Sequence, residues 1–160
     1  MTRPTVSALA LALASLAAAH GAGAQNATQN PALANPASVR VRYMVNDVAA
    51  AVAFYRDQLG FRLDMQSGPY FAALSRGGVQ LLLSPTKGPG GASQPMPDGQ
   101  KPVPGGWNRI VLYVPDVQGE AARLRKAGVH FRNDIVTGLG GKEILLDDPS
   151  GNSVELFQPG

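Results

Sequence analysis

The stretch from Gly140 to Gln158, GGKEILLDDPSGNSVELFQ, decides the fold of this chain. The apolar run Ile144–Leu146 suits a buried strand, and the alternating run Ser153–Phe157 suits a second strand with two different faces. Between them, the segment DDPSGN favours a tight turn, because proline fixes φ, glycine permits positive φ, and Asp and Asn bond the local backbone. We therefore predict a β-hairpin that carries Glu155 on its second strand.

This hairpin ends the second of two similar β-α-β-β-β units. The segments VNDV and VPDV match at an offset of 69 residues, which indicates an internal duplication. In the first unit we predict a helix capped by Asp47 that runs to about Leu59, and strands over Val39–Val45, Phe61–Met65, Pro69–Leu74 and Val79–Leu83. In the second unit we predict a helix over Gln118–Ala127 capped by Asp116, and strands over Arg109–Val114, Val129–Arg132, Lys142–Leu146 and Ser153–Phe157.

A linker joins the two units, which span residues 39–83 and 106–160. The linker, residues 84–105, contains six prolines and five glycines, a composition that prevents regular structure. A loop of this length within a compact domain is often functional. We predict that it is a mobile flap whose end at Trp107 gates a cavity.

The first 38 residues are not expected to belong to the fold. Arg3, the apolar run Val6–Ala19 and the A-x-A site at residues 22–24 predict a signal peptide over residues 1–24, cleaved on export. The alternative is a membrane anchor, for which the apolar run is short. Residues 25–38 are predicted to be a disordered tether, so the mature chain is expected to be periplasmic or secreted, in a bacterium, without inserting into a membrane.

Composition excludes several classes of site. The chain has no cysteine, which rules out disulfides, thiolate catalysis and cysteine-bound metals. Lysine and arginine are scattered, so we expect no binding of nucleic acid. His130 is the only histidine after the predicted signal peptide.

Three segments resemble the vicinal oxygen chelate superfamily, which includes glyoxalase I, extradiol dioxygenases and bleomycin-resistance proteins. They are VNDVAAAVAFYRDQLGF, GGWNRIVLYVPDV and DDPSGNSVELF, and the resemblance covers nearly all of residues 39–158. It implies an α+β fold in which two tandem βαβββ modules form a curved eight-stranded sheet around a cavity, with helices outside. It also implies a homodimer, which would protect the open edges of the sheet.

The resemblance also defines four positions at which family members bind a metal through His, Glu or Gln. In this sequence they hold Arg40, Leu81 (or Gln80, if the alignment slips by one residue), Arg109 and Glu155. Arginine has no lone pair to offer a metal, so Glu155 is the one family-type ligand retained. We therefore expect neither a metal nor another cofactor.

A charged cavity is expected in place of the metal. Arg109 and Glu155 should point inward from neighbouring strands, as a buried ion pair, as ligand contacts, or both. Arg40 and Arg42 would add positive charge that suits a carboxylate, sulfate or phosphate on a ligand. Trp107 either covers the mouth of the cavity or packs on the sheet end, and the other aromatic residues serve as contacts or core. The predicted cavity residues are Arg40, Arg42, Tyr70, Trp107, Arg109, Tyr113, Glu155 and Phe157.

Three functions remain open at this point. The first is an exported, metal-free protein that binds a small, partly apolar molecule, which can carry an anionic group. The second is a glyoxalase- or dioxygenase-like metal-dependent lyase or oxidoreductase with an atypical metal site. The third is a structural or interaction role without a ligand. The arginines at ligand positions favour the first function, and no catalytic residue is assigned.

Overall fold

The computed structural model describes residues 39–160, so the predicted signal peptide and tether lie outside the described residues. Two modules follow one another along this part of the chain. The first contains β1 (Val39–Val45), α1 (Val48–Ala53), the π-helical turn η2 (Phe54–Gln58), β2 (Arg62–Ser67), β3 (Phe71–Arg76) and β4 (Val79–Pro85). The second contains β5 (Ile110–Tyr113), α2 (Val117–Lys126), β6 (Val136–Gly138), β7 (Gly141–Asp147) and β8 (Ser153–Pro159).

The strands form two four-stranded sheets that do not close into a barrel. Their strand orders are β1-β4-β3-β2 and β5-β8-β7-β6, the same arrangement in both modules. In each module the first strand lies parallel to the last, because a helix carries the chain back across the sheet. The predicted α+β fold of two βαβββ modules is confirmed, with the eight strands divided between two sheets.

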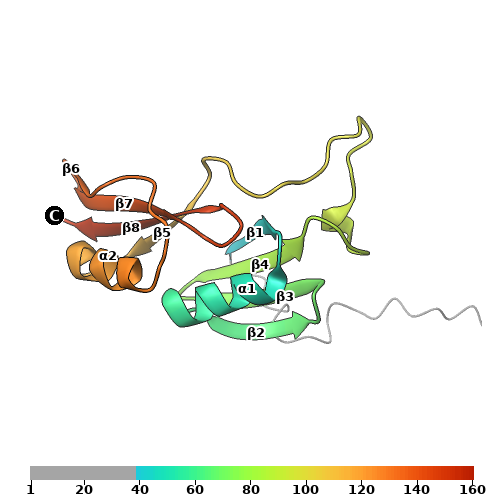
Figure 1. Cartoon of the computed structure of the whole chain (residues 1–160), viewed down its shortest axis with the longest axis horizontal. Coiled ribbons are helices and arrows are strands. Elements are labelled where there is room, and N and C mark those ends of the chain that lie inside the picture. Colours follow the sequence, from blue (N-terminus) through green and yellow to red (C-terminus); the bar gives the residue numbers. More distant parts are fainter. Residues whose placement is uncertain (1–38) are drawn as a thin grey trace, which may run out of the picture.

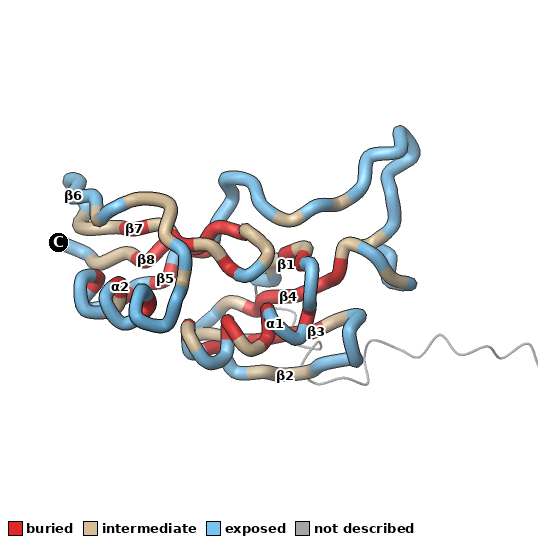
Figure 2. The backbone as a smooth tube through the Cα atoms, viewed as in Figure 1, coloured by how far each residue is buried: buried red, intermediate tan, exposed pale blue. Residues whose placement is uncertain are grey.

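Each helix begins at the predicted aspartate and covers one face of its sheet. Asp47 Oδ1 accepts from the amide of Ala50 at 3.0 Å, and Asp116 Oδ1 accepts from the amides of Gln118 and Gly119 at 3.1 and 3.0 Å. Figure 2 shows that buried residues gather along the strands and on the helix faces that meet them. The other face of each sheet is therefore the one left to form a site.

The segment Val129–Arg132 was predicted as a strand, and this prediction is wrong. It makes only an isolated bridge, Phe131 to Leu146, and β6 is instead the strand that pairs with the outer side of β7. Two backbone hydrogen bonds flank this bridge, from the Arg132 amide to the Leu145 carbonyl at 2.9 Å and from the Asp147 amide to the His130 carbonyl at 3.0 Å. The Asp147 side chain adds to them: it accepts from Arg132 Nε at 2.6 Å, and its other oxygen lies 2.8 Å from Nδ1 of His130.

The linker leaves β4 after Pro85 and reaches β5 at Ile110, with one short 3-10 turn, η3 (Gly91–Ser93). Figure 1 shows it arching away from both modules. It is fixed near its two ends, where Ser93 Oγ donates to the carbonyl of Pro85 at 2.7 Å and the amide of Gly105 donates to Asn152 Oδ1 at 2.8 Å. Among residues 39–160, neither helix has the length and apolar character needed to cross a membrane.

Hydrogen bonds fasten the two modules together. The hydroxyl of Tyr43 accepts from the amide of Ile110 at 2.9 Å and donates to the carbonyl of Ser153 at 3.0 Å. The hydroxyl of Tyr55 donates to Asp148 at 3.1 Å, and Asn152 Nδ2 donates to the carbonyl of Met44 at 2.9 Å. The DDPSGN turn therefore holds the modules in register as well as joining β7 to β8.

Candidate functional site

The strongest candidate site is the face of the second sheet that points away from α2, which we call the open face. Register places Val111, Glu155 and Leu145 beside one another across β5, β8 and β7. The side chains of the open face belong to Trp107, Arg109, Val111, Tyr113, Leu145, Glu155 and Phe157. Five of the eight predicted cavity residues are among them.

An ion pair stands at the centre of the open face. Arg109 Nε lies 2.5 Å from Glu155 Oε2, as predicted from the sequence. The Glu155 side chain is 7% exposed, whereas that of Arg109 is 33% exposed. Glu155 engages one guanidinium nitrogen, and Arg109 Nη1 makes only a long contact of 3.5 Å with the Trp107 carbonyl. Arginine has five N–H donors, so this side chain retains capacity for a ligand.

Aromatic and aliphatic side chains surround the ion pair. Tyr113 and Phe157 meet edge to face, with ring centroids 5.5 Å apart. Tyr113 is 68% exposed, and Val111 beside it is 43% exposed. The open face therefore offers apolar contact area on both sides of a charged centre.

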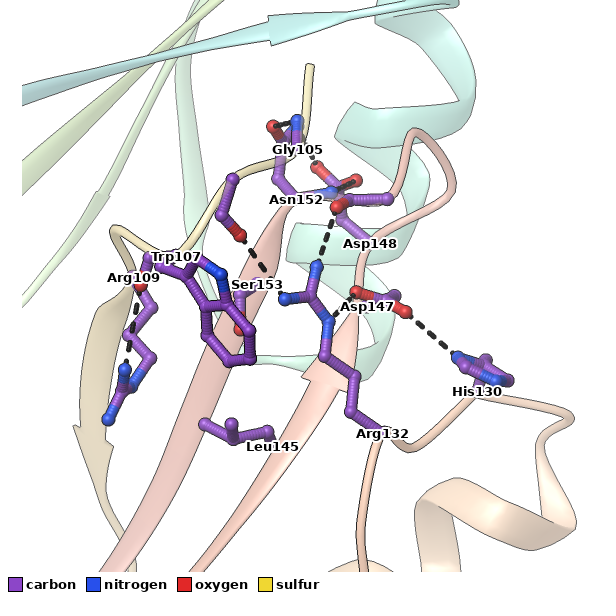
Figure 3. Close-up of polar contacts among 12 residues, drawn as sticks. Gly105, Trp107, Arg109, His130, Arg132, Leu145, Asp147, Asp148, Asn152 and Ser153 are labelled. Carbon is purple, nitrogen blue, oxygen red and sulfur yellow. Dashed lines mark hydrogen bonds and ion pairs between the residues drawn. The ribbon is translucent and has the colours of Figure 1, made fainter.

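Trp107 is the most exposed aromatic residue in this group, at 76%. The guanidinium carbon of Arg132 lies 5.9 Å from the centre of its ring. Arg132 is held in turn by Asp147 and by the carbonyls of Gly106 and Gly151, at 3.2 and 2.9 Å (Figure 3). Arg132 therefore fixes the end of the linker beside the open face. Sequence patterns do not reveal this role, because the segment that carries Arg132 resembles a strand.

The predicted residues of the first sheet form a second group. Arg42 donates to Ser84 Oγ at 2.5 Å and lies over the ring of Phe71, 5.9 Å from its centre. Arg40 faces Gln80 in register, and neither residue is without a partner. Arg42 is thus engaged within its own module.

A short polar row continues from Gln80 across the first sheet. Gln80 Nε2 donates to Asp64 at 3.1 Å, and Ser75 also donates to this carboxylate. Arg62 pairs with the other carboxylate oxygen at 2.7 Å. The carboxylate is nearly fully buried, at 3% exposed, and three side chains of its own sheet contact it, so we interpret this row as a structural network.

Tyr70 stands apart from both groups. It is 53% exposed in the turn before β3, beside Gly88 of the linker. A hollow of about 320 Å³ lies between the modules, and of the eight predicted residues only Tyr113 lines it. Within one chain, the eight predicted residues therefore lie in three places: the open face of the second sheet, the first sheet, and the turn before β3.

The four family metal positions do not fit a metal in this chain. Arg42 in β1 and Val111 in β5 are equivalent at the offset of 69 residues. Arg42 pairs with Leu82 in the first module, and Val111 pairs with Glu155 in the second. The counterpart of Glu155 is therefore Leu82; the sequence alignment to Leu81 or Gln80 was wrong, because it was shifted along the strand. No cluster of three His, Cys, Asp or Glu side chains that could hold a metal occurs within residues 39–160.

The comparisons with known proteins agree with this architecture. The family model described as Glyoxalase/Bleomycin resistance protein/Dioxygenase superfamily matches residues 37–156. No curated protein matches the chain in sequence.

Many solved structures share the fold, and three illustrate their range. Lactoylglutathione lyase from Agrobacterium tumefaciens is 22% identical over 78% of this chain and 94% of its own, with a TM-score of 0.60. TnmS3, an antibiotic binding protein from Streptomyces sp. CB03234, is 25% identical over 77% and 95%, with a TM-score of 0.59. A glyoxalase/bleomycin resistance protein/dioxygenase superfamily member from Sphaerobacter thermophilus is 23% identical over 76% and 95%, also with a TM-score of 0.59.

Proposed function

Because the chain belongs to the glyoxalase/bleomycin resistance protein/dioxygenase superfamily, we propose that it is a metal-independent binding protein of that superfamily. Its ligand is a small, partly apolar molecule that can carry an anionic group. The ligand lies on the open face of the second sheet, against Trp107, Tyr113 and the pair formed by Arg109 and Glu155.

One observation carries this proposal. Glu155, the only family-type metal ligand retained, is bound by Arg109 at 2.5 Å. A cation in the position of a second metal ligand repels a metal ion and neutralises the one carboxylate that would attract it. The same guanidinium keeps unused donors beside exposed aromatic rings, which is an arrangement for holding an organic anion.

The shape and charge of the open face define the ligand class. The open face exposes apolar surface on Tyr113, Val111 and Trp107. Covering this surface with a ligand removes it from water, which is favourable in free energy. Arg109 can donate to a carboxylate or sulfonate group while Glu155 remains paired. TnmS3 is an antibiotic binding protein, and its likeness to this chain at 25% identity supports binding as the activity proposed here.

The test uses 1-anilinonaphthalene-8-sulfonate, a fluorescent aromatic sulfonate, as the probe. We expect saturable binding to the folded protein, weakened at least about fivefold, or roughly 1 kcal/mol, in Tyr113→Ser and in Trp107→Ala. The matched control is Tyr70→Ser, which removes a tyrosine that is also exposed, at 53%, but lies outside the open face. Equal loss in the control, or no saturation, would exclude the open face as the site.

Elemental analysis of protein purified without chelators accompanies this test. We expect no stoichiometric zinc, iron, nickel or manganese, because one carboxylate that is already paired is a poor metal site. About one metal ion per chain would overturn the metal-independent proposal and favour the enzymatic alternative.

Export and dimerisation are further parts of the proposal. The basic, apolar and A-x-A segments at the start of the sequence support export to the periplasm or beyond. The outer strands of the two sheets and the apolar side chains of the open face support a homodimer. Light scattering that gives the mass of one chain over a wide concentration range would overturn the dimer.

A further inference from the structure

The hollow between the modules is bounded on one side by the edge of a sheet. Its volume is about 320 Å³, and four consecutive residues of β5, Ile110–Tyr113, form one wall. Consecutive residues of a strand point to opposite faces, so a pocket that touches all four lies along the strand edge. β5 is an outer strand of its sheet, paired only with β8 within the described residues.

The backbone of β5 directs hydrogen-bonding groups into this hollow. The amide of Val114 donates to the carbonyl of Phe157 in β8, at 2.9 Å. The amide of Ile110 reaches β8 through the Tyr43 hydroxyl, which donates to Ser153. Strand backbone groups alternate in direction, so the N–H and C=O groups of Val111 and Tyr113 point away from β8. These two residues offer two donors and two acceptors at the edge.

The opposite wall comes from the first module and is apolar apart from one cation. It consists of Phe61, Arg76, Gly77 and Val79. Arg76 Nη1 donates to the carbonyl of Leu59 at 2.8 Å, which fixes the guanidinium at the hollow.

The nearest acid on the neighbouring helix does not cancel the charge of Arg76. The pKa of Glu120 is lowered mainly by its hydrogen bond from Arg123. The charge of Arg76 lowers the same pKa to a smaller extent. Glu120 and Arg123 are themselves paired at 2.6 Å. Arg76 therefore remains available as a counter-charge for a bound group.

We propose that this hollow binds an extended peptide segment, which adds as a strand to the edge of β5 and places a carboxylate against Arg76. A small apolar ligand would use the walls but would leave the four backbone groups of Val111 and Tyr113 without partners. A peptide satisfies these groups, and its alternate side chains contact Phe61 and Val79. The site is distinct from the open face, although Val111 and Tyr113 contribute to both.

The test measures fluorescence polarisation of a fluorescein-labelled Gly-Gly-Val-Thr-Val-Asp amide with the full mature chain. Two further probes carry N-methyl groups, one on both valines and the other on Thr and Asp, so that each removes one alternating set of peptide N–H donors. Strand addition uses only one set. We therefore expect one methylated probe to bind at least about tenfold more weakly while the other binds like the parent. Equal binding of both, or equal loss of both, would overturn the proposal.

Variants of the protein test the other two elements of the site. Val111→Pro removes an outward N–H without touching the ladder to β8, and Val111→Thr is its matched control. Arg76→Gln should weaken binding of the parent probe about fivefold. It should not change binding of a probe that ends in Asn instead of Asp. If Val111→Pro fails to fold, the methylated probes on the unaltered protein still decide the question. Full retention of binding in Arg76→Gln would overturn the carboxylate contact.

Discussion

The hydroxyl of Tyr43, in the first module, donates to the carbonyl of Ser153 in the second at 3.0 Å. The same hydroxyl accepts from the amide of Ile110 at 2.9 Å. It thus occupies the place where the ladder between β5 and β8 would otherwise make its next direct bond. A side chain of one module completes the sheet of the other, so the second sheet depends on the first module for its edge.

Tyr43→Phe should destabilise the protein by about 1–3 kcal/mol. The change leaves a buried N–H and a buried C=O without their shared partner, and such groups carry the full cost of desolvation. Urea unfolding monitored by circular dichroism measures the loss. Tyr70→Phe is the control and should stay within about 0.5 kcal/mol, because Tyr70 is exposed. A loss no larger than the control would mean that the strands close the gap directly.

Stability should fall at alkaline pH because of the same residue. Burial is the main cause that raises the pKa of Tyr43 from 10.0 to about 12. The neutral hydroxyl therefore contributes stability that is fully present below pH 10 and is lost between pH 10 and about 12, by roughly 2–3 kcal/mol. Urea unfolding at several pH values across this window measures the effect.

Tyr55 should add to this alkaline loss. Burial, followed by the charge of Asp148, raises its pKa well above the ordinary value. In Tyr43→Phe the pH dependence should become shallower but should not vanish, because Tyr55 still titrates on unfolding. A pH dependence unchanged by the substitution would contradict the assignment to Tyr43.

Arg109→Ala should destabilise the fold by about 2–3 kcal/mol. It leaves Glu155 buried without its partner, while the partial exposure of Arg109 keeps the loss below the about 3–5 kcal/mol of a fully buried pair. Replacing Arg109 with Met and Glu155 with Leu together should restore most of the stability. A double-mutant cycle by urea unfolding gives the coupling energy, and a value near zero would show that the pair contributes no interaction.

Arg132→Gln should loosen the end of the linker. It removes the guanidinium that binds Asp147 and the carbonyls of Gly106 and Gly151. Trp107 is the only tryptophan, so its fluorescence anisotropy reports this directly and should fall. Arg125→Gln is the matched control, since Arg125 lies over Phe131 and not over Trp107. An equal fall in both variants would point to general loosening of the 125–134 segment.

Shortening the linker within residues 88–100 should change binding of the sulfonate probe more than it changes the free energy of unfolding. The linker contributes little buried surface, and Figure 2 shows most of it exposed. Its far end nevertheless places Trp107 beside the open face. Probe titration and urea unfolding on the same deletion measure the two quantities, and parallel losses would make the linker a structural strap.

Much of the fold could be predicted because it follows from local sequence. The caps at Asp47 and Asp116, the hairpin around DDPSGN and the offset of the duplication all depend on short-range patterns. The contact of Arg109 with Glu155 could also be predicted, since the duplication sets which strands are neighbours.

The remaining features depend on contacts between distant segments. The spacing of Val129–Arg132 resembles a strand, yet this segment makes only one bridge to β7, and Val136–Gly138 provides the longer ladder. The hydroxyl of Tyr43 gives no sequence signal beyond an apolar ring on a buried face. The placement of Arg132 under Trp107 depends on the path of a linker that has no periodicity.

The joint between the modules also makes the two halves of the duplication non-interchangeable. At the offset of 69 residues, Tyr43 corresponds to Leu112 and Tyr55 to Leu124, so only the first module carries hydroxyl donors at these places. The acceptors, Ser153 and Asp148, belong to the second module, whose long turn corresponds to a tight turn at Gly77 and Gly78 in the first. Two first modules would lack the Asp148 carboxylate and the Asn152 amide, and two second modules would lack both tyrosine hydroxyls. The repeat has thus become a complementary pair, in which each half carries bridging side chains that the other half lacks.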